Sequence, residues 1–325
     1  METKLPSRGV RVAETFEDLR PLLFSIAYRM LGSVAEAEDI VQDSFLRYHR
    51  ALSEQGAEID SPKAYLSAVA TRLSIDHLRS ARMRREEYVG EWLPEPLLTD
   101  DRAPEGAWYV EEADSLSMAF LLLLERLTPV ERAVFLLHDV FDYAYDEVAG
   151  IVGKSADNCR QLAVRARRHI DENKPRFEAS RAERDRLATR FFDAVEDGDI
   201  EDLVEMLAAD VVVYGDGGGT SPSWRNPILG RDKVARLMLG IGRHSRERGG
   251  TIRRTEINGQ PGVMFLDAGG RLIHVMSIDI ADGVVQTVRS IINRDKLRHL
   301  GPLADLRPLF HPRRAAGRAP GTESA

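Results

Sequence analysis

The chain has 325 residues, of which 43% are hydrophobic and 30% charged, and its formal net charge is −7. This length has room for two or three domains of ordinary size. No apolar run reaches the roughly 18 residues that a membrane span needs, and the N-terminus lacks the core of a signal peptide, so we expect a cytoplasmic protein. The single cysteine excludes an internal disulfide and a cysteine-based zinc site within the monomer.

Three amphipathic helices are predicted within the first 85 residues. Apolar residues recur at helical spacing between residues 16 and 30, and Gly32 ends that helix, which follows a loose lead over residues 1–14. Ser33 and Glu36 have the spacing of a capping box, which predicts the start of a second helix. The third helix is predicted to begin at Pro62.

Two of these helices carry outward polar or charged side chains that could contact a partner. The second helix turns Asp39, Gln42 and Asp43 outward. The third helix carries the basic residues Lys63, Arg72, Arg79 and Arg82 together with Tyr65. The alternative for both surfaces is solvated charge, since basic residues at a helix end also suit the helix dipole.

The helical pattern stops over residues 86–114. Pro94 and Pro96 prevent a helix there. Trp92 and Leu93 stand in this linker, where polar residues are usual. Such an apolar pair predicts that the linker packs against another part of a protein.

A helix-turn-helix is predicted over residues 128–170, after an apolar helix over residues 115–127. Its second helix covers residues 145–152, Gly153 supplies a left-handed stop, and Ser155 is a suitable N-cap for the third helix. The buried stripe of that third helix is formed by Cys159, Leu162, Ala163, Ala166 and Ile170.

The outward face of this third helix carries side chains that can read bases in a major groove. Arginine pairs with guanine, glutamine pairs with adenine, and an apolar side chain can touch the thymine methyl group. The candidate DNA-reading residues are Ser155, Asn158, Arg160, Gln161, Val164, Arg165 and Arg168. The alternative is a solvated basic helix in an ordinary bundle. Because phosphate neutralisation supplies most non-specific affinity, the acidic net charge favours a reader that another protein carries to DNA.

After Pro175 the pattern changes to helices followed by short strands. Helices are expected over residues 184–196, 199–207 and 230–239, and strands over residues 211–214, 251–257, 263–266, 271–280 and 284–292. Asp282 and Gly283 give a type I′ hairpin signal. This order indicates an α+β domain whose curved antiparallel sheet encloses a cavity.

The polar residues of this domain do not indicate a catalytic site. The candidates are Asp216, His274, Asp279 and Arg289. Strand alternation puts His274 on the side of the apolar Leu272 and Met276, where a lone histidine is more often structural. We therefore expect no catalytic residue, no metal site and no cofactor. The triple glycine at residues 217–219 allows close approach of another segment, and the linker around residues 92–96 is the economical partner.

Two segments resemble parts of bacterial sigma factors. The helix-turn-helix resembles region 4, the reader of the −35 promoter element, in LTPVERAVFLL, YDEVAGIVGKS and CRQLAVRARR. The N-terminal helices resemble region 2 of the extracytoplasmic-function (ECF) sigma factors in AYRMLGSVAEAEDIVQDSFLRY. The resemblance implies that the third helix meets the opened −10 element. There Lys63, Arg72, Arg79 and Arg82 could follow the backbone of the melted strand, and Tyr65 could stack on a base. It also implies contacts with the β′ clamp helices of core RNA polymerase through Asp39, Gln42, Asp43 and Phe45.

Three motifs narrow the resemblance to ECF sigma factors of the sigma-J type (group 41), which have a C-terminal SnoaL-like domain. Those factors carry WLPEP in the linker, DGGGK in the C-terminal domain and NPDKL near its end. Here WLPEP is intact, whereas Thr220 replaces the lysine and Arg294 the proline. The resemblance implies linker-to-domain contacts through Trp92, Leu93, Pro94, Asp216, Gly217, Gly218, Gly219, Asn293, Asp295, Lys296 and Leu297.

The expected fold is multidomain, with two all-α sigma domains followed by an α+β, cone-shaped SnoaL-like domain. The expected divisions are region 2 at 1–85, the linker at 86–114, region 4 at 115–175, the regulatory domain at 180–300 and a disordered tail at 301–325.

The function implied is promoter-specific transcription initiation, regulated in cis by the C-terminal domain. The partners implied are core RNA polymerase (β′ clamp helices and β flap), promoter DNA and a small-molecule ligand in the C-terminal cavity, with no membrane partner. Two alternatives stay open: a free-standing helix-turn-helix regulator, and an isomerase- or cyclase-like enzyme fused to a DNA-binding part.

Overall fold

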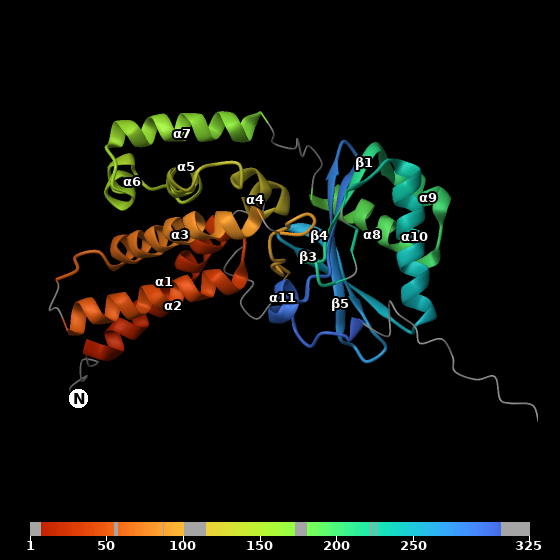
Figure 1. The fold of residues 1–325 in the computed structure, drawn as a ribbon, viewed down its shortest axis with the longest axis horizontal. Coiled ribbons are helices and arrows are strands. Elements are labelled where there is room, and N and C mark those ends of the chain that lie inside the picture. The colour runs from red at the N-terminus through yellow and green to blue at the C-terminus, as the bar shows by residue number, and fades with distance from the viewer. Residues whose placement is uncertain are drawn as a thin grey trace, which may run out of the picture.

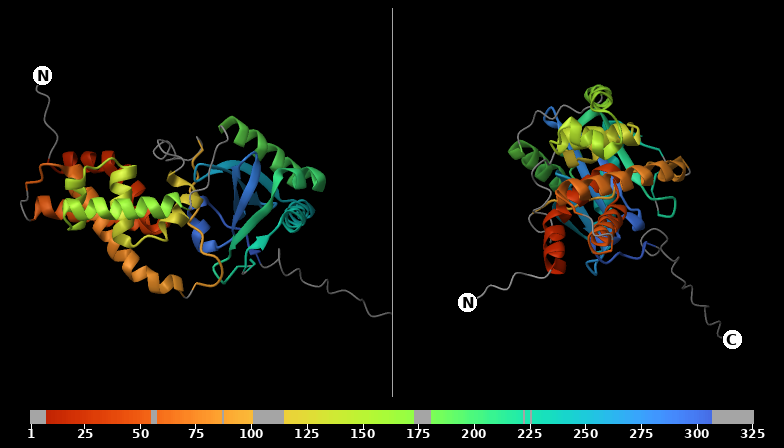
Figure 2. Two further views of the ribbon diagram at one scale, coloured as in Figure 1. Left: turned by 90° about the horizontal axis from the view of Figure 1, so that it is seen from above. Right: turned by 90° about the vertical axis from the view of Figure 1, so that its left-hand side faces the viewer.

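The chain forms two lobes that lie side by side, one helical and one α+β (Figure 1). The computed structural model describes residues 8–54, 58–86, 88–100, 115–172, 181–221, 223–224 and 226–306, and describes side chains in all of these except 8–14 and 81–86. Residues 88–100 lie between the two lobes and contact both, as the views from two further directions also show (Figure 2).

The helical lobe has a single apolar core to which both predicted sigma regions contribute. Its elements are α1 (Arg8–Leu31), α2 (Val34–Ser53), α3 (Pro62–Glu86), α4 (Met118–Leu124), α5 (Pro129–Phe135), the π-helical turn η3 (Leu136–Val140), α6 (Tyr145–Val152) and α7 (Ala156–Asp171). The expectation of a loose lead over residues 1–14 is wrong for residues 8–14, which continue α1 toward the N-terminus. The apolar helix before α5 was expected over residues 115–127, but α4 covers only Met118–Leu124.

The α+β lobe contains one six-stranded sheet in the order β2-β1-β6-β5-β4-β3. Its elements are α8 (Arg181–Asp197), α9 (Ile200–Met206), β1 (Leu207–Asp216), β2 (Ile228–Leu229), α10 (Arg231–Glu247), β3 (Thr251–Ile257), β4 (Gln260–Leu266), β5 (Leu272–Ala281), β6 (Val284–Ile291), α11 (Arg294–Leu297) and the 3-10 turn η4 (Arg298–Leu300). The expected α+β class and the antiparallel β3–β6 meander are confirmed. The sequence did not indicate that β1 pairs parallel with β6.

The sheet has a buried core on each face. Helices α8, α9 and α10 cover one face (Figure 1). On the other face Leu93 of the linker and Met118 of α4 pack with apolar residues of the strands. Because neighbouring strand residues point to opposite faces, Met264 and Phe265 lie in different cores. The second core therefore joins the two lobes.

Two expectations, one about strand β5 and one about the residues after 300, need correction. Leu272 does not share the core of Met276, since the β4–β5 register shifts between Phe265 and Leu266. Residues 301–306 do not form a disordered tail: the backbone N–H of Ala304 donates to the Leu272 carbonyl at 2.8 Å, and Ala304 is buried. The disorder expected beyond about Phe310 concerns residues outside the described part. The type I′ turn is confirmed, with φ of 52° at Asp282 and 71° at Gly283.

Candidate interdomain junction and nucleic-acid surfaces

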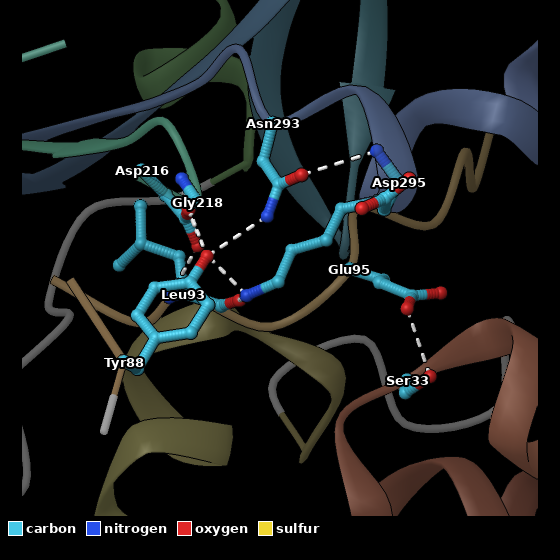
Figure 3. Close-up of polar contacts among 9 residues, drawn as sticks. Ser33, Tyr88, Leu93, Glu95, Asp216, Gly218, Asn293 and Asp295 are labelled. Atoms are coloured by element: carbon cyan, nitrogen blue, oxygen red, sulfur yellow. Dashed lines mark hydrogen bonds and ion pairs between the residues drawn. The ribbon is translucent and has the colours of Figure 1, made fainter. Parts of the chain in front are cut away.

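The carboxylate of Asp216 is the centre of the contacts between the linker and the α+β lobe (Figure 3). Asp216 ends β1, and its side chain is 0% exposed. Its Oδ2 accepts hydrogen bonds from the Leu93 backbone N–H at 2.9 Å and from Lys296 Nζ at 2.7 Å. Its Oδ1 accepts from the Tyr88 hydroxyl and from the Gly218 backbone N–H. One carboxylate thus binds the linker, the glycine turn and α11.

Lys296 supplies the positive charge of this cluster, and its side chain is only 8% exposed. Its ammonium group also donates to the Leu93 carbonyl and lies 4.3 Å from the centroid of the Trp92 ring. Burial and the hydrogen bond to Asp216 raise the pKa of Tyr88, so its hydroxyl keeps its proton. A buried ion pair is stable only when its remaining polar atoms also have partners, and these contacts provide them.

Gly218 permits the close packing around Asn293. Its φ is +62°, and a Cβ atom there would lie 2.5 Å from Asn293 Nδ2. That amide nitrogen donates to the Tyr88 hydroxyl at 2.8 Å. Two motif positions do not enter the junction through their side chains, because Thr220 is exposed and the Asp295 carboxylate pairs with exposed Arg298 at 2.6 Å.

The linker also caps α2 in the helical lobe. The expected capping box is only half present: Ser33 accepts from the Glu36 backbone N–H at 3.2 Å, but the Glu36 carboxylate pairs with His77. Glu95 caps other groups at this end of α2 (Figure 3). Its Oε2 accepts from two backbone N–H groups of the first turn, at 2.7 and 3.2 Å, and its Oε1 accepts from the Ser33 hydroxyl at 2.8 Å. A carboxylate here satisfies N–H groups that the helix itself cannot.

Trp92 contacts both lobes. On one side its ring faces the Lys296 ammonium group. On the other side lies Gly32, where a Cβ atom would be 2.8 Å from the indole ring. Gly32 has a φ of +68° and follows the last residue of α1. The Trp-Leu pair of the linker is therefore packed between the lobes, as its sequence predicted.

Asn258 is a junction residue that sequence reasoning missed. It lies in the turn between β3 and β4, with a φ of 53° and no exposed surface. Its Nδ2 donates to the Tyr28 hydroxyl of α1 at 2.7 Å and to the Leu116 carbonyl, just before α4, at 3.0 Å. Its Oδ1 accepts from the Leu97 backbone N–H at 3.0 Å. The dipeptide Asn258-Gly259 signals a hairpin turn, but no spacing indicates what such a turn contacts.

Helix α3 binds the helix-turn-helix directly. The Arg72 guanidinium donates to the carbonyls of Gly150 and Ile151 at 2.7 and 2.8 Å, and so occupies the C-terminal end of α6. The hydroxyls of Ser67 and Tyr143 are 2.7 Å apart and buried. Arg72 was predicted to follow DNA, whereas its hydrogen bonds here join α3 to the helix-turn-helix.

The other −10 candidates have different surroundings. Lys63 is exposed, and its Nζ is 5.4 Å from the centroid of the Tyr143 ring. Tyr65 is half-buried against the Tyr48 ring. Arg79 is exposed and pairs with a neighbouring aspartate. The Arg82 side chain lies outside the described residues. None of these placements tests a contact with DNA.

The outward face of α2 combines charge with one apolar residue. Asp39, Gln42 and Asp43 are exposed, as predicted. Leu46 follows them at helical spacing and is 49% exposed, so it extends the same face. The sequence pattern had not indicated this residue. Phe45 instead packs against Phe16, with ring centroids 4.6 Å apart, and is half-buried.

Helix α7 presents one buried and one exposed face. The Ser155 side chain accepts from the Asn158 backbone N–H at 3.2 Å, which confirms the predicted N-cap, and Gly153 has a φ of +68°. The predicted buried stripe is confirmed at all five positions. All of the DNA-reading candidates are exposed, namely Ser155, Asn158, Arg160, Gln161, Val164, Arg165 and Arg168. Val164 is 62% exposed, so its methyl groups are available to a partner on this face.

The four candidates for catalysis lie at three separate places. Asp216 belongs to the junction, and Asp279 pairs with Arg289 on the sheet face of the second core. His274 faces the opposite side, where its ring stacks on Phe265 with centroids 4.1 Å apart. Within the described residues, no helix is long and apolar enough to cross a bilayer, and no three His, Cys, Asp or Glu side chains are grouped to hold a metal ion.

Burial lowers the pKa of His274 to about 3. Below about pH 6.5 the unfolded chain binds a proton at this histidine that the folded chain does not bind. The free energy of unfolding should therefore fall as the pH falls from about 6.5 toward 3. The variant His274→Phe should lose less stability over that range. Its ionisable neighbours Arg236, His244, Arg248 and Asp267 are unchanged. Urea unfolding at several pH values measures both profiles, and parallel profiles would contradict this prediction.

The chain is similar to sigma factors in two family models and in several relatives. Sigma-70 region 2 matches residues 15–84, and Sigma-70 region 4 matches residues 117–170. The ECF RNA polymerase sigma factor SigJ of Mycobacterium tuberculosis is 36% identical over 289 residues, which cover 86% of this chain and 91% of that protein. The probable ECF sigma factor SigI of the same species is 31% identical, and the match covers 86% of this chain and 92% of that one.

The fold is similar to a solved structure as well. The crystal structure of Mycobacterium tuberculosis SigJ superposes with a TM-score of 0.72 at 34% sequence identity. The superposition covers 90% of this chain and 100% of that chain, so it includes both lobes and the linker between them.

Proposed function

The chain belongs to the ECF RNA polymerase sigma factors, and we propose that its α+β lobe regulates promoter-specific initiation by controlling how far the two sigma regions separate. Two exposed faces of the helical lobe support the core of this function most directly. The face of α2 with Asp39, Gln42, Asp43 and Leu46 suits the β′ clamp helices of core polymerase. The exposed face of α7 suits the −35 element.

The two DNA-reading parts are too close together to bind a promoter as they stand. The −10 and −35 elements are about 25 base pairs apart, which is about 85 Å of duplex at about 3.4 Å per base pair. Helix α6 packs against both α3 and α7, so only one helix separates the two readers. Packed helix axes are about 8–10 Å apart, which puts α3 and α7 about 20 Å apart. We infer that promoter binding requires the regions to separate.

Separation would break specific contacts. The Arg72 hydrogen bonds to α6 and the Ser67–Tyr143 pair join α3 to the helix-turn-helix. The linker is bound by Asp216 and Lys296 of the α+β lobe at the same time as it caps α2. In this proposal, the α+β lobe stabilises the closed arrangement through the linker, and region 4 is free to reach the −35 element and the β flap once the arrangement opens.

Run-off transcription with purified core polymerase tests this function in the full chain. Replacing Gln161 or Arg165 with alanine should lower promoter-dependent transcription about 5- to 150-fold, since a base contact contributes about 1–3 kcal/mol of discrimination. Core binding, measured separately, should not change. Exposed Arg243 of α10 gives the control variant Arg243→Ala, with no expected effect. A chain that bound duplex DNA specifically but did not bind core polymerase would contradict the proposal.

A further inference from the structure

A cavity of about 420 Å³ lies between α10 and strands β4 and β5. Small-molecule sites commonly have volumes of about 300–1,000 Å³. Four apolar side chains form much of the wall, namely Leu237, Ile241, Phe265 and Ile273. The junction residues described above are not part of this cavity, which is therefore a separate place for a ligand.

Two residues that line the cavity, Ser245 and His274, each have a buried side-chain polar atom without a hydrogen-bond partner among the described residues. These atoms are Ser245 Oγ and His274 Nε2. Leaving a buried polar atom unpaired costs about 1–3 kcal/mol, so native structures seldom keep two in one place without a reason. A hydroxyl group is the simplest complement to both, because it can donate to one atom and accept from the other.

The charged residues of the cavity favour an anion. Arg236 and Arg248 both line it, and the Arg248 guanidinium also lies 2.8 Å from His244 Nδ1. Asp267 is the only acidic lining residue that the structure describes, and its carboxylate already accepts from the Gly269 and Arg271 backbone N–H groups. The two arginines are exposed or half-buried, whereas His274 and Ser245 are buried. The positive charge therefore stands nearer the mouth.

We propose that this cavity binds a small apolar carboxylic acid that carries a hydroxyl group. Its carboxylate would face Arg236 and Arg248, its apolar body would lie against Phe265 and Ile241, and its hydroxyl would reach His274 and Ser245. The buried imidazole is neutral at physiological pH, so it can accept a hydrogen bond from the hydroxyl.

Strands β4 and β5 line the cavity with one face and the core that holds the linker with the other. Phe265 and His274 line the cavity, while Met264 and Val275, the adjacent residues, lie in the core that holds Leu93 and Met118. A ligand that shifts β4 or β5 would thus also act on the packing of the linker. This regulatory consequence rests on the proposed function, whereas binding itself does not.

Calorimetric titration of the full chain with para-coumarate tests the binding site, since this probe has a carboxylate, an apolar body and a hydroxyl. Cinnamate lacks the hydroxyl and methyl para-coumarate lacks the charge, and each should bind about 3- to 10-fold more weakly. His274→Phe keeps a ring of similar size and should reduce para-coumarate binding to the level of cinnamate. Ser245→Ala should act in the same direction, and Arg243→Gln should have no effect.

Absence of para-coumarate binding, or equal binding of all three probes by the wild-type chain, would overturn the proposed site. Unchanged para-coumarate affinity in both His274→Phe and Ser245→Ala would overturn it too. Run-off transcription with para-coumarate separates the two hypotheses. Binding with no change in transcription would leave the site standing and remove its regulatory link. Binding by a chain that fails to bind core polymerase would refute the sigma function alone.

Discussion

Replacing Asp216 with asparagine is expected to lower the free energy of unfolding of the α+β lobe by about 3–5 kcal/mol, the usual cost of removing one partner from a buried ion pair. The change leaves the Lys296 ammonium buried without its carboxylate. It also weakens the acceptor for the Leu93 backbone N–H, so the linker should detach before the sheet unfolds. Denaturant unfolding gives the free energy, and hydrogen exchange at the Leu93 amide reports the linker.

Two further variants make this result specific. Asp295→Asn removes a carboxylate from the adjacent helix α11 that pairs only at the exposed surface, and should change stability by less than about 0.5 kcal/mol. The double variant Asp216→Asn with Lys296→Met should recover part of the loss, because a buried pair is often replaced by apolar groups without a net penalty. Equal stability of Asp216→Asn and Asp295→Asn would show that the buried pair does not hold the junction.

Replacing Asn258 with alanine is expected to lower the free energy of unfolding by about 3–7 kcal/mol. The loss leaves the Leu97 N–H and the Leu116 carbonyl buried without partners, at about 1–3 kcal/mol for each group. The positive φ adds about 1 kcal/mol, because alanine adopts the left-handed region poorly. The two lobes should then reorient, which small-angle X-ray scattering of the full chain would register as a larger radius of gyration.

Asp282→Ala is a matched control for the backbone part of that effect. Asp282 occupies the equivalent position of the β5–β6 turn, with a φ of 52°, but it is exposed and lies outside the junction. The free energy of unfolding of this variant should fall only by the conformational contribution, about 1 kcal/mol. A double-mutant cycle of Asn258→Ala with Tyr28→Phe would isolate the hydrogen bond to α1. Similar stability of Asn258→Ala and Asp282→Ala would show that the junction contacts of Asn258 contribute little.

Local signals in the sequence predicted local structure well. Helix α6 has the predicted bounds, and α7 follows the predicted N-cap with the predicted buried stripe. A glycine stop, a serine cap and a 3.6-residue repeat act over a few residues, so each can be read from the chain alone. The Asp282-Gly283 turn was predicted for the same reason.

Features that depend on distant partners could not be read in this way. The spacing of Ser33 and Glu36 predicted a capping box, but Glu36 pairs with His77 and the linker residue Glu95 accepts from the N–H groups of the first turn. A register shift in the sheet separated Leu272 from Met276, against simple alternation. The packing of residues 301–306 on β5 has no periodic signal, because it consists of backbone hydrogen bonds and a few small contacts.

The candidate junction was predictable in its segments but not in its atoms. The resemblance indicated that the linker, the glycine turn and the end of the chain belong together. It did not distinguish Lys296, which is buried beside Asp216, from Asp295, which is exposed. Asn258 lies outside all three motifs, and only the fold brings it to Tyr28 and Leu116.

The cap that Glu95 places on α2, the helix that we propose to bind polymerase, makes α2 a thermodynamic partner of the α+β lobe. If release of the linker frays the first turn of α2 and weakens polymerase binding by some factor, polymerase binding must strengthen retention of the linker by the same factor. An N-cap contributes about 0.5–2 kcal/mol, which corresponds to a factor of about 2 to 30. Core polymerase would then engage the closed chain first, and promoter DNA would supply the free energy that opens it.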